Sequence, residues 1–329
     1  MSSHEPALEF KDIVKRYRQR GVTGTRDVRA VNGVTLTVHP RQTVALVGES
    51  GCGKSTLAKV AVALEAPTEG AVRVLGHDMS AMKGSALRKH RRTVSMVFQD
   101  PASSLNPRWK VLDVVSEPLR VQFGGSSKKY RSKVVELLLE VGLDEGYLTR
   151  RSDELSGGQR QRVGIARALA LDPKVIVLDE AVSALDVSVQ AQVLNLLNRI
   201  KELHGLSYLF ISHDLSVVRH VSDYLAVMYL GQVVEEGPAE NVFDDPQHPY
   251  TLALLNAIPP DTPTAPRPAR VAVRGELPDP ANPPPGCPFA SRCWKVQDLC
   301  REERPDLAHV RGQSRVACHF PNTDEGDMS

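Results

Sequence analysis

A glycine-rich segment of eight residues places the strongest constraint on how this chain folds. Gly48-Glu-Ser-Gly-Cys-Gly-Lys54-Ser55 follows the apolar run 43–47 and opens an amphipathic stretch, 54–64. A glycine-rich turn between a strand and a helix directs backbone N–H groups and the helix N-terminus toward phosphate oxygens. Lys54 would then reach the β- and γ-phosphates, and the Ser55 hydroxyl would ligate Mg²⁺. The segment predicts a phosphate site on an α/β fold, because a plain structural turn does not require this lysine and hydroxyl.

Short β-branched runs alternate with amphipathic stretches as far as residue 258. This alternation predicts a mainly parallel sheet with helices on both faces. We read residues 18–27 as an insertion. The expected strands are 8–14, 31–38, 43–47, 72–75, 94–98, 175–178, 208–211 and 224–228, and the expected helices are 54–64, 132–141, 158–170 and 189–203.

Composition excludes several classes of protein. The chain has 41 Lys+Arg against 39 Asp+Glu and 41% hydrophobic residues, so disorder and a large cationic face for nucleic acid are both disfavoured. No run approaches the roughly 18 apolar residues of a membrane helix. Residues 1–12 lack the apolar core of a secretory signal. We therefore expect a cytosolic chain without a nucleic-acid partner, and any membrane-spanning segment would belong to other subunits.

Two acids end a second apolar run. Asp179 and Glu180 follow the run 175–178. A buried strand that ends in carboxylates places them at the edge of the sheet where phosphates bind. We expect Asp179 to hold Mg²⁺ through water and Glu180 to orient or deprotonate the attacking water. Taken alone, acids at a strand end are common, and the phosphate segment is what makes them candidates.

A third motif, Leu155-Ser-Gly-Gly-Gln159, precedes another helical stretch. Ser156 is a good N-cap, and Gly157 and Gly158 leave the first amides of the helix accessible to an anion. About 100 residues separate this motif from the first phosphate segment. The residues leave open whether both helix ends serve one nucleotide within the chain or two nucleotides across a dimer.

In their order, these motifs resemble the ATP-binding-cassette ATPases. The set also includes Gln99, the segment Ser183-Ala-Leu-Asp186, and His213 after the run 208–212. The resemblance implies a P-loop NTPase fold with a mainly parallel core sheet, an antiparallel N-terminal sheet and a helical subdomain at about 100–170. It also implies that two cassettes bind two ATP molecules head to tail, so that isolated monomers are poor ATPases.

The resemblance assigns a role to each motif residue. Glu180 would be the catalytic base, assisted by His213, Lys54 and Gln99, and Tyr17 would stack on adenine. Ser55, Gln99 and Asp179 would hold Mg²⁺. Ala181 stands where the family usually has proline, which implies a slight loosening of Glu180. The residues implied to bind ATP are Tyr17, Gly48, Glu49, Ser50, Gly51, Cys52, Gly53, Lys54, Ser55, Thr56, Gln99, Asp179 and His213, with Ser156, Gly157, Gly158 and Gln159 acting in trans and Asp186 coupling the two sites.

Four further segments resemble the ATPase subunits of oligopeptide, dipeptide and nickel importers, in the form of the second of two such subunits. They are 99–108, 183–197, 248–251 and 275–293. This implies an ATP-hydrolysing subunit that energises uptake of di- or oligopeptides at the cytoplasmic face of the cell membrane. Its partners would be a related ATPase in a heterodimer, two membrane permeases that contact the region after Gln99, and an extracytoplasmic peptide-binding protein. The alternatives are a non-transport cassette ATPase and a redox-responsive regulatory ATPase.

The C-terminal part differs in composition from the rest. Eleven of the 23 prolines lie between residues 259 and 288. We expect a cassette at 1–258, a proline-rich linker at 259–286 and a metal-binding extension at 287–329, because so small a segment usually needs a staple. Members of the importer branch can carry a [4Fe-4S] cluster here, so we expect one, with Zn²⁺, free thiols or disulfides as alternatives. The ligands would be Cys287, Cys293, Cys300 and Cys318.

Overall fold

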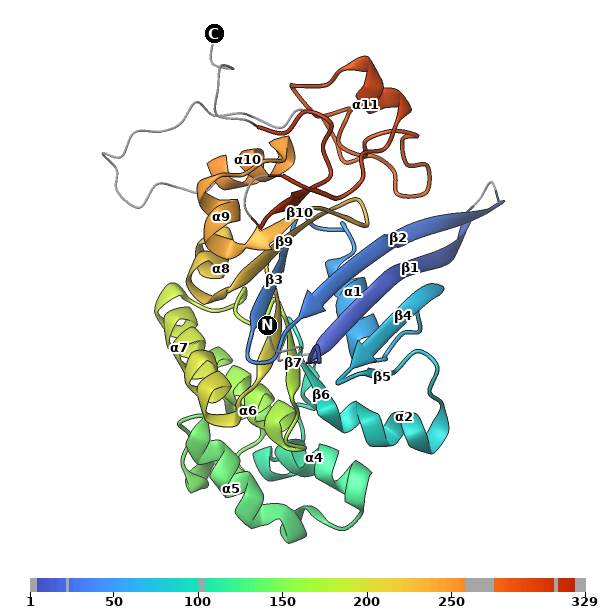
Figure 1. Ribbon diagram of the computed structural model, residues 1–329. Coiled ribbons are helices and arrows are strands. Elements are labelled where there is room, and N and C mark those ends of the chain that lie inside the picture. Colours follow the sequence, from blue (N-terminus) through green and yellow to red (C-terminus); the bar gives the residue numbers. More distant parts are fainter. Residues whose placement is uncertain (1–4, 22–23, 101–103, 258–274, 311–312, 323–329) are drawn as a thin grey trace, which may run out of the picture.

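The computed structural model describes residues 5–21, 24–100, 104–257, 275–310 and 313–322 of the 329-residue chain. Within these ranges the chain forms two sheets and the helices that cover them (Figure 1). The strands are β1 (Leu8–Gly21), β2 (Gly24–Val38), β3 (Thr43–Val47), β4 (Glu69–Val74), β5 (His77–Asp78), β6 (Val94–Val97), β7 (Val175–Asp179), β8 (Ser207–Ile211), β9 (Tyr224–Tyr229), β10 (Gln232–Pro238), β11 (Ala308–His309) and β12 (Arg315–Val316). The helices are α1 (Lys54–Ala61), α2 (Gly84–His90), α4 (Val111–Phe123), α5 (Arg131–Glu140), α6 (Gly157–Leu169), α7 (Val187–His204), α8 (Leu215–Val221), α9 (Ala239–Asp244), α10 (Pro249–Asn256) and α11 (Asp298–Glu302), with 3₁₀ turns η1 (Arg91–Thr93), η2 (Ser127–Tyr130), η3 (Glu145–Thr149) and η4 (Ser152–Glu154).

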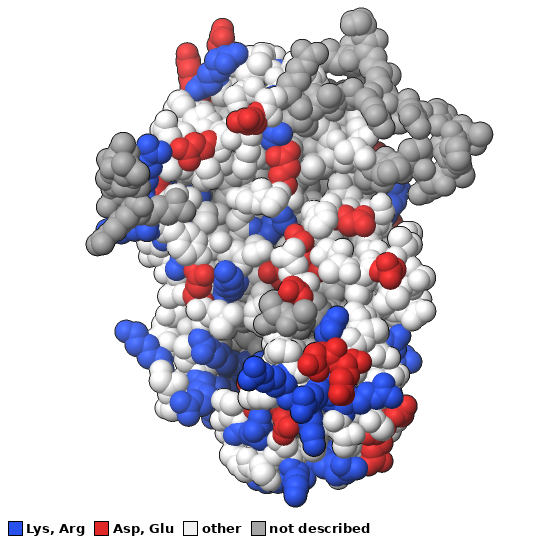
Figure 2. All heavy atoms as spheres, turned by 180° about the vertical axis from the view of Figure 1, so that it is seen from behind, with Lys and Arg blue, Asp and Glu red and all other residues white. Residues whose placement is uncertain are grey.

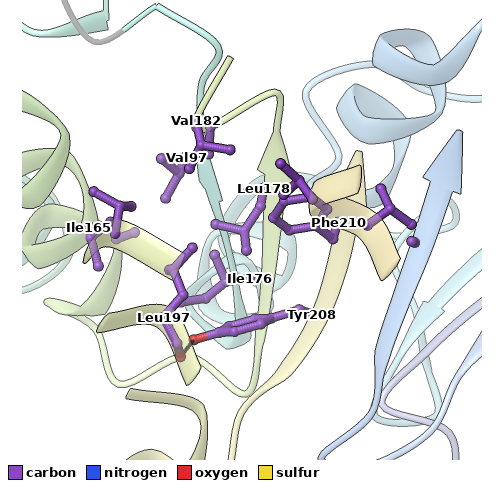
Figure 3. Close-up of a cluster of buried hydrophobic side chains, with 14 of the residues drawn as sticks. Val97, Ile165, Ile176, Leu178, Val182, Leu197, Tyr208 and Phe210 are labelled. Carbon is purple, nitrogen blue, oxygen red and sulfur yellow. Dashed lines mark hydrogen bonds between the residues drawn. The ribbon is translucent and has the colours of Figure 1, made fainter. Parts of the chain in front are cut away.

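The larger sheet has the strand order β11-β12-β10-β9-β3-β8-β7-β6. Strands β9, β3, β8, β7 and β6 run parallel, as the alternation of strands and helices predicts. Both faces are buried, and alternate residues of one strand enter different cores. Ile176 and Leu178 of β7 pack toward α6 and α7 (Figure 3). Val175 and Val177 belong to the other core, with residues of α1. Each such side chain stabilises the fold by about 1.5–3 kcal/mol, so the sheet has a fixed orientation between its helices.

The smaller sheet is antiparallel, with the order β2-β1-β4-β5. Its hairpin is longer than expected, because β1 and β2 stay paired as far as Gly21 and Gly24. Residues 18–21 and 24–27 thus belong to the two paired strands of this hairpin, and their interpretation as an insertion stays a prediction. Figure 1 shows this hairpin reaching past the edge of the core sheet.

Helices α4, α5 and α6 gather at one end of the molecule (Figure 1). Helix α4 was not among the predicted helices, although its buried residues Val111, Val114, Val115 and Leu119 have helical spacing. Pro118 inside the helix obscures that pattern. The antiparallel sheet, the mainly parallel sheet and this helical end together confirm the predicted architecture.

The C-terminal part joins the core sheet at its edge. Strand β10 pairs antiparallel with β9, and Glu235 and Glu236 of β10 pair with Val316 and Arg315 of β12. The expected boundary at 258 lies outside the described residues, so the division at 258 and 286 stays a prediction. Among the residues that the structure describes, no helix has both the length and the apolar character needed to cross a membrane.

Candidate functional site

The glycine-rich loop after β3 is closely packed against its surroundings. A Cβ at Gly48 would lie 2.1 Å from the carbonyl oxygen of Met228, and one at Gly53 would lie 2.1 Å from that of Ala30. Both glycines have positive φ, 150° and 108°. No other residue fits at these two positions, because a side chain would collide with backbone. The loop between them is therefore held in one shape, with helix α1 starting directly behind it.

Lys54 lies across this loop. Its side chain is almost completely buried, and Nζ donates hydrogen bonds to the carbonyl oxygens of Gly48 at 2.7 Å and Glu49 at 2.9 Å. These contacts hold the ammonium group at the mouth of the loop. Phosphate oxygens reaching the loop would meet a positive charge that is already oriented.

Ser55 and Asp179 form a second polar contact beside the loop. The Ser55 hydroxyl donates a hydrogen bond of 3.2 Å to Asp179 Oδ1. Burial raises the pKa of the Asp179 carboxyl above its ordinary value, so a neighbouring cation would stabilise its charged form. A hydroxyl and a carboxylate from adjacent elements are the oxygen ligands that Mg²⁺ prefers, so these residues fit the predicted metal.

Three side chains from the ends of three adjacent strands meet in front of the loop. Gln99 Nε2 donates a hydrogen bond of 2.7 Å to Glu180 Oε2, and His213 Nδ1 lies 3.2 Å from the same oxygen. Glu180 has φ of 46°, and its backbone N–H donates to the carbonyl of Ile211. This left-handed conformation turns the carboxylate back toward the cavity. Ala181 behind it is buried, and Glu180 is held by its two neighbours without a proline there.

A cavity of about 500 Å³ joins these groups. It is lined by Ala30, Ser50, Gly51, Gly53, Lys54, Ser55, Thr56, Gln99, Glu180 and His213. One wall thus supplies N–H groups and an ammonium, and the opposite wall supplies a carboxylate, an amide and an imidazole. This arrangement can bind a polyphosphate and accept a proton from water next to it.

Tyr17 lies on β1 at the side of this cavity. Its hydroxyl donates a hydrogen bond to Glu65 and also contacts the Thr56 side chain. Burial raises the pKa of the Tyr17 hydroxyl. Lys15 Nζ lies 5.2 Å from the centre of the ring. The ring is therefore held beside the first turn of α1, and its contact with adenine stays a prediction.

Residues 156–159 of the third motif line a different cavity, of about 420 Å³. Ser156 and Gln159 form a capping box in which Ser156 Oγ accepts from the Gln159 N–H and the Ser156 N–H donates to Gln159 Oε1. At Gly158 a Cβ would lie 2.6 Å from a methyl carbon of Val189, so a larger residue there would force Val189 to move. Asp186 lines the same cavity at the start of α7. The two cavities share no lining residue, so the two motifs do not form one site in this chain.

Two segments of this chain match known protein families. Residues 31–183 match the family described as ABC transporter, and residues 234–300 match the C-terminal region of oligopeptide/dipeptide transporters. The oligopeptide transport ATP-binding protein AppF of Bacillus subtilis (strain 168) is 45% identical over 324 residues, which cover 97% of this chain and 98% of AppF. The chain belongs to the ABC transporter ATP-binding proteins. The dipeptide transport ATP-binding protein DppF of Escherichia coli (strain K12) is also 45% identical, over 98% of this chain and 96% of DppF.

Solved cassette structures agree with this family. The dimeric ATP-binding cassette MJ0796 bound to ADP and Pi has a TM-score of 0.63 and 31% sequence identity to this chain. The match covers 70% of this chain and 98% of the MJ0796 chain. The predicted fold and the prediction of an ATPase are therefore confirmed. As a member of this family, the chain is expected to use ATP and Mg²⁺.

The prediction of an iron-sulfur cluster is wrong. Cys287, Cys293, Cys300 and Cys318 are free cysteines beside one narrow apolar cavity, yet no group of three His, Cys, Asp or Glu in the described ranges is arranged to hold a metal ion. Burial raises the pKa of Cys287 to about 11 and of Cys318 to about 12, so both side chains are neutral thiols near pH 7 in the chain as described. Strand β12 joins this region to the core sheet, and Phe289 is fully buried against Tyr229 of the cassette.

Arg292 was not among the site residues predicted from the sequence. It reaches the phosphate loop from the part of the chain that holds Cys287, Cys293, Cys300 and Cys318, called here the cysteine-bearing region. Its guanidinium contacts the Glu49 carboxylate across 243 residues of sequence. The motif around it, Cys-Pro-Phe-Ala-Ser-Arg-Cys at 287–293, marked the region as unusual but gave no sign of a partner.

Proposed function

We propose that this chain is the ATP-hydrolysing subunit of an ABC importer that energises the uptake of di- or oligopeptides. The observation that carries the catalytic part is the meeting of Gln99, Glu180 and His213 in front of the phosphate loop. The names of the relatives support the peptide part, since AppF and DppF are oligopeptide and dipeptide transport ATP-binding proteins.

In this proposal the phosphates of ATP occupy the loop 48–56. Lys54 and the loop amides would bind the β- and γ-phosphates. Ser55, Gln99 and Asp179 would hold Mg²⁺, which would supply positive charge to neutralise the phosphates. Glu180 accepts a proton from the attacking water. His213 donates a hydrogen bond to the γ-phosphate. Glu180 Oε2 has two polar neighbours, Gln99 and His213. Turning Gln99 toward the metal would remove the first of these contacts and make room for water at that oxygen.

The second cavity supports a dimer. Ser156, with Gly157, Gly158 and Gln159, would contact the γ-phosphate held by another cassette, and Asp186 would connect the two sites. The separation of the two cavities in one chain favours this arrangement, as does the dimer that MJ0796 forms. We infer that the partner is a related but non-identical ATPase, because the segments 99–108 and 183–197 have the form typical of the second of two subunits.

A groove next to Gln99 supports contact with membrane permeases. Its volume is about 230 Å³, and it lies between β6 and helices α4 and α6. Leu64 and Phe98 at its rim are 54% and 37% exposed. We propose that a cytoplasmic helix of a permease occupies this groove, so that closure of the dimer moves the permease.

The surface charge supports a position at the cytoplasmic face of the membrane. Figure 2 shows Lys and Arg side chains gathered over the lower half of one face, the half that carries α4 and α5. Segment 83–92 alone has five Lys or Arg and no acid. Basic surfaces are attracted to the anionic cytoplasmic leaflet. In this proposal residues 1–258 form the cassette, 259–286 the linker and 287–329 the extension.

Co-expression with the permeases and the peptide-binding protein tests the proposal. In proteoliposomes that hold ATP, we expect peptide uptake that depends on the binding protein and disappears when Glu180→Gln replaces this chain. A matched variant, Arg219→Gln, lies on an exposed ion pair with Asp244 and should leave uptake unchanged. A chain that hydrolyses ATP but neither co-purifies with permeases nor supports uptake would favour the non-transport or the redox-regulated ATPase.

A further inference from the structure

The contact between Arg292 and Glu49 links the C-terminal region to the phosphate loop. Nη1 donates to Glu49 Oε2 at 2.8 Å and Nη2 donates to Oε1 at 3.1 Å. Two parallel bonds of this kind fix the carboxylate in both position and plane. The Arg292 side chain is only 9% exposed, and the Glu49 side chain is 30% exposed, so water screens the pair less than an ordinary surface ion pair.

Arg292 is held in place by the buried ring of Phe289. The Arg292 N–H donates a hydrogen bond of 3.0 Å to the Phe289 carbonyl in a tight turn. Phe289 is fully buried, and its ring lies 5.3 Å from that of Tyr229 and 5.4 Å from that of Tyr250. The guanidinium also lies 5.8 Å from the centre of the Tyr229 ring. The position of the charge therefore depends on how the cysteine-bearing region sits on β9 and α10.

Glu49 is held at three points. Its N–H donates a hydrogen bond of 2.9 Å to the Tyr250 hydroxyl, its carboxylate contacts Arg292, and its carbonyl accepts from Lys54 Nζ. Glu49 thus contacts both Arg292 and Lys54, the lysine that faces the phosphates. Because the N–H of Glu49 is engaged by Tyr250, the phosphates must bind to amides further along the loop.

The charge of Glu49 opposes the ligand. A carboxylate at the start of a phosphate loop repels an incoming polyphosphate, and the repulsion is greatest where water is partly excluded. Arg292 cancels that charge and keeps the carboxylate turned toward the C-terminal region. Loss of Arg292 would leave an unpaired negative charge at the loop.

We propose that Arg292 is a positioning residue of the ATP site, which holds and neutralises Glu49 so that the seating of the cysteine-bearing region sets the affinity of the chain for ATP. This inference rests on the proposed function, because it takes ATP as the ligand of the loop. It adds a contribution to the site from a region outside the ABC transporter match at 31–183.

Binding of a fluorescent ATP analogue to the full chain tests the proposal. We expect Arg292→Gln to weaken binding about tenfold, which corresponds to about 1.4 kcal/mol. Arg292→Lys keeps the positive charge but cannot form two parallel hydrogen bonds, so its affinity for the analogue should lie between those of wild type and Arg292→Gln. The loss should shrink as the salt concentration rises, because it is electrostatic. In ATPase assays of the assembled complex, KM for ATP should rise while kcat changes little, since the groups around Glu180 are untouched.

A double variant separates charge from structure. Glu49→Gln should bind the analogue more tightly than wild type, because Arg292 then remains as an extra cation. Glu49→Gln with Arg292→Gln should recover most of the affinity lost in Arg292→Gln. Arg219→Gln is the matched control, since it removes an arginine from an exposed ion pair far along the sequence from the loop.

Two results would overturn the proposal. One is wild-type affinity in Arg292→Gln. The other is a double variant as weak as Arg292→Gln, which would mean that Arg292 acts only by folding the region. If Arg292→Gln does not fold, the comparison of Glu49→Gln with the double variant decides. Equal affinities of these two variants for the analogue would contradict the proposal, because they would mean that the charge of Arg292 has no effect on the ATP site. Failure of the wild-type chain to bind ATP would instead overturn the proposed function itself.

Discussion

Glu180 Oε2 accepts a hydrogen bond of 2.7 Å from the side-chain amide of Gln99. The two residues follow neighbouring parallel strands, β7 and β6, and therefore meet at the same edge of the sheet. The bond holds the carboxylate in the cavity and at the same time occupies the oxygen that would accept a proton. Nucleotide-dependent movement of Gln99 thus has a direct chemical consequence for Glu180.

Glu180→Gln should abolish hydrolysis while leaving ATP binding intact. A glutamine has nearly the same shape but cannot accept the proton, and loss of a general base typically costs about 10²–10⁴-fold in rate. We expect phosphate release from the assembled complex to fall by that order. Size-exclusion chromatography with ATP should show more dimer than for wild type, because hydrolysis no longer reopens the closed dimer. Normal turnover at the site built by this chain's Glu180 would contradict its role as the base.

Lys54→Ala should weaken ATP binding at least about tenfold. The buried ammonium offers charge-assisted hydrogen bonds that are typically worth about 1.5–3 kcal/mol each. Titration with a fluorescent ATP analogue measures the loss. Lys59→Ala is the matched control, since Lys59 lies on the same helix but is half-exposed and pairs loosely with Glu65 at 3.8 Å. Equal affinities for the two variants would contradict the role of Lys54.

Much of this site could be predicted from local sequence. Gln99, Asp179, Glu180 and His213 each follow an apolar run, and parallel strands bring their ends together whatever the loop lengths are. The glycines of the phosphate loop were also predicted from the sequence, and the structure has no room for a side chain at Gly48 or Gly53.

The parts that could not be predicted depend on contacts between distant segments. Nothing near Arg292 indicates that it meets Glu49, because 243 residues separate them and the pairing follows from the seating of Phe289. The expectation of a metal site rests on the small size of the segment and on the resemblance to the importer branch, because the pairing of β12 with β10 is not visible in the sequence. A strand of two residues carries no periodic signal of its own.

Ser156→Ala should reduce both stability and hydrolysis. Ser156 caps α6 through the Gln159 N–H, and loss of such a cap costs roughly 1 kcal/mol. Its proposed contact with ATP across the dimer would be lost as well. Asp144→Ala is the control, because Asp144 caps η3 by accepting from the Gly146 N–H and lines neither cavity. We expect similar losses of thermal stability in both variants but loss of ATPase activity only in Ser156→Ala. Equal ATPase activities would contradict the role in trans.

The buried pair of Glu235 and His248 predicts a characteristic dependence of stability on pH. Glu235 Oε2 accepts a hydrogen bond of 2.9 Å from the backbone N–H of His248, and the side chains of both residues are almost completely buried. Burial lowers the pKa of His248 to about 3 and raises the pKa of Glu235 to about 7. Below pH ~6.5 the unfolded histidine binds a proton that the folded one does not, so its contribution to stability falls as pH falls. Above pH ~4.5 the unfolded glutamate releases a proton that the folded one keeps, so its contribution falls as pH rises.

Between pH ~4.5 and ~6.5 the contributions of His248 and Glu235 to stability oppose each other. His248→Asn removes the contribution of His248 and should reveal that of Glu235. Asparagine can still accept the Tyr250 N–H that His248 Nδ1 accepts, but it does not titrate. Urea unfolding of the variant should show stability that falls with rising pH by about 1.4 kcal/mol per unit relative to wild type, because one proton is removed from the balance. His39→Asn, at an exposed histidine, controls for the loss of a histidine. Parallel pH profiles for wild type and His248→Asn would mean that His248 is protonated in the folded chain as readily as in the unfolded one.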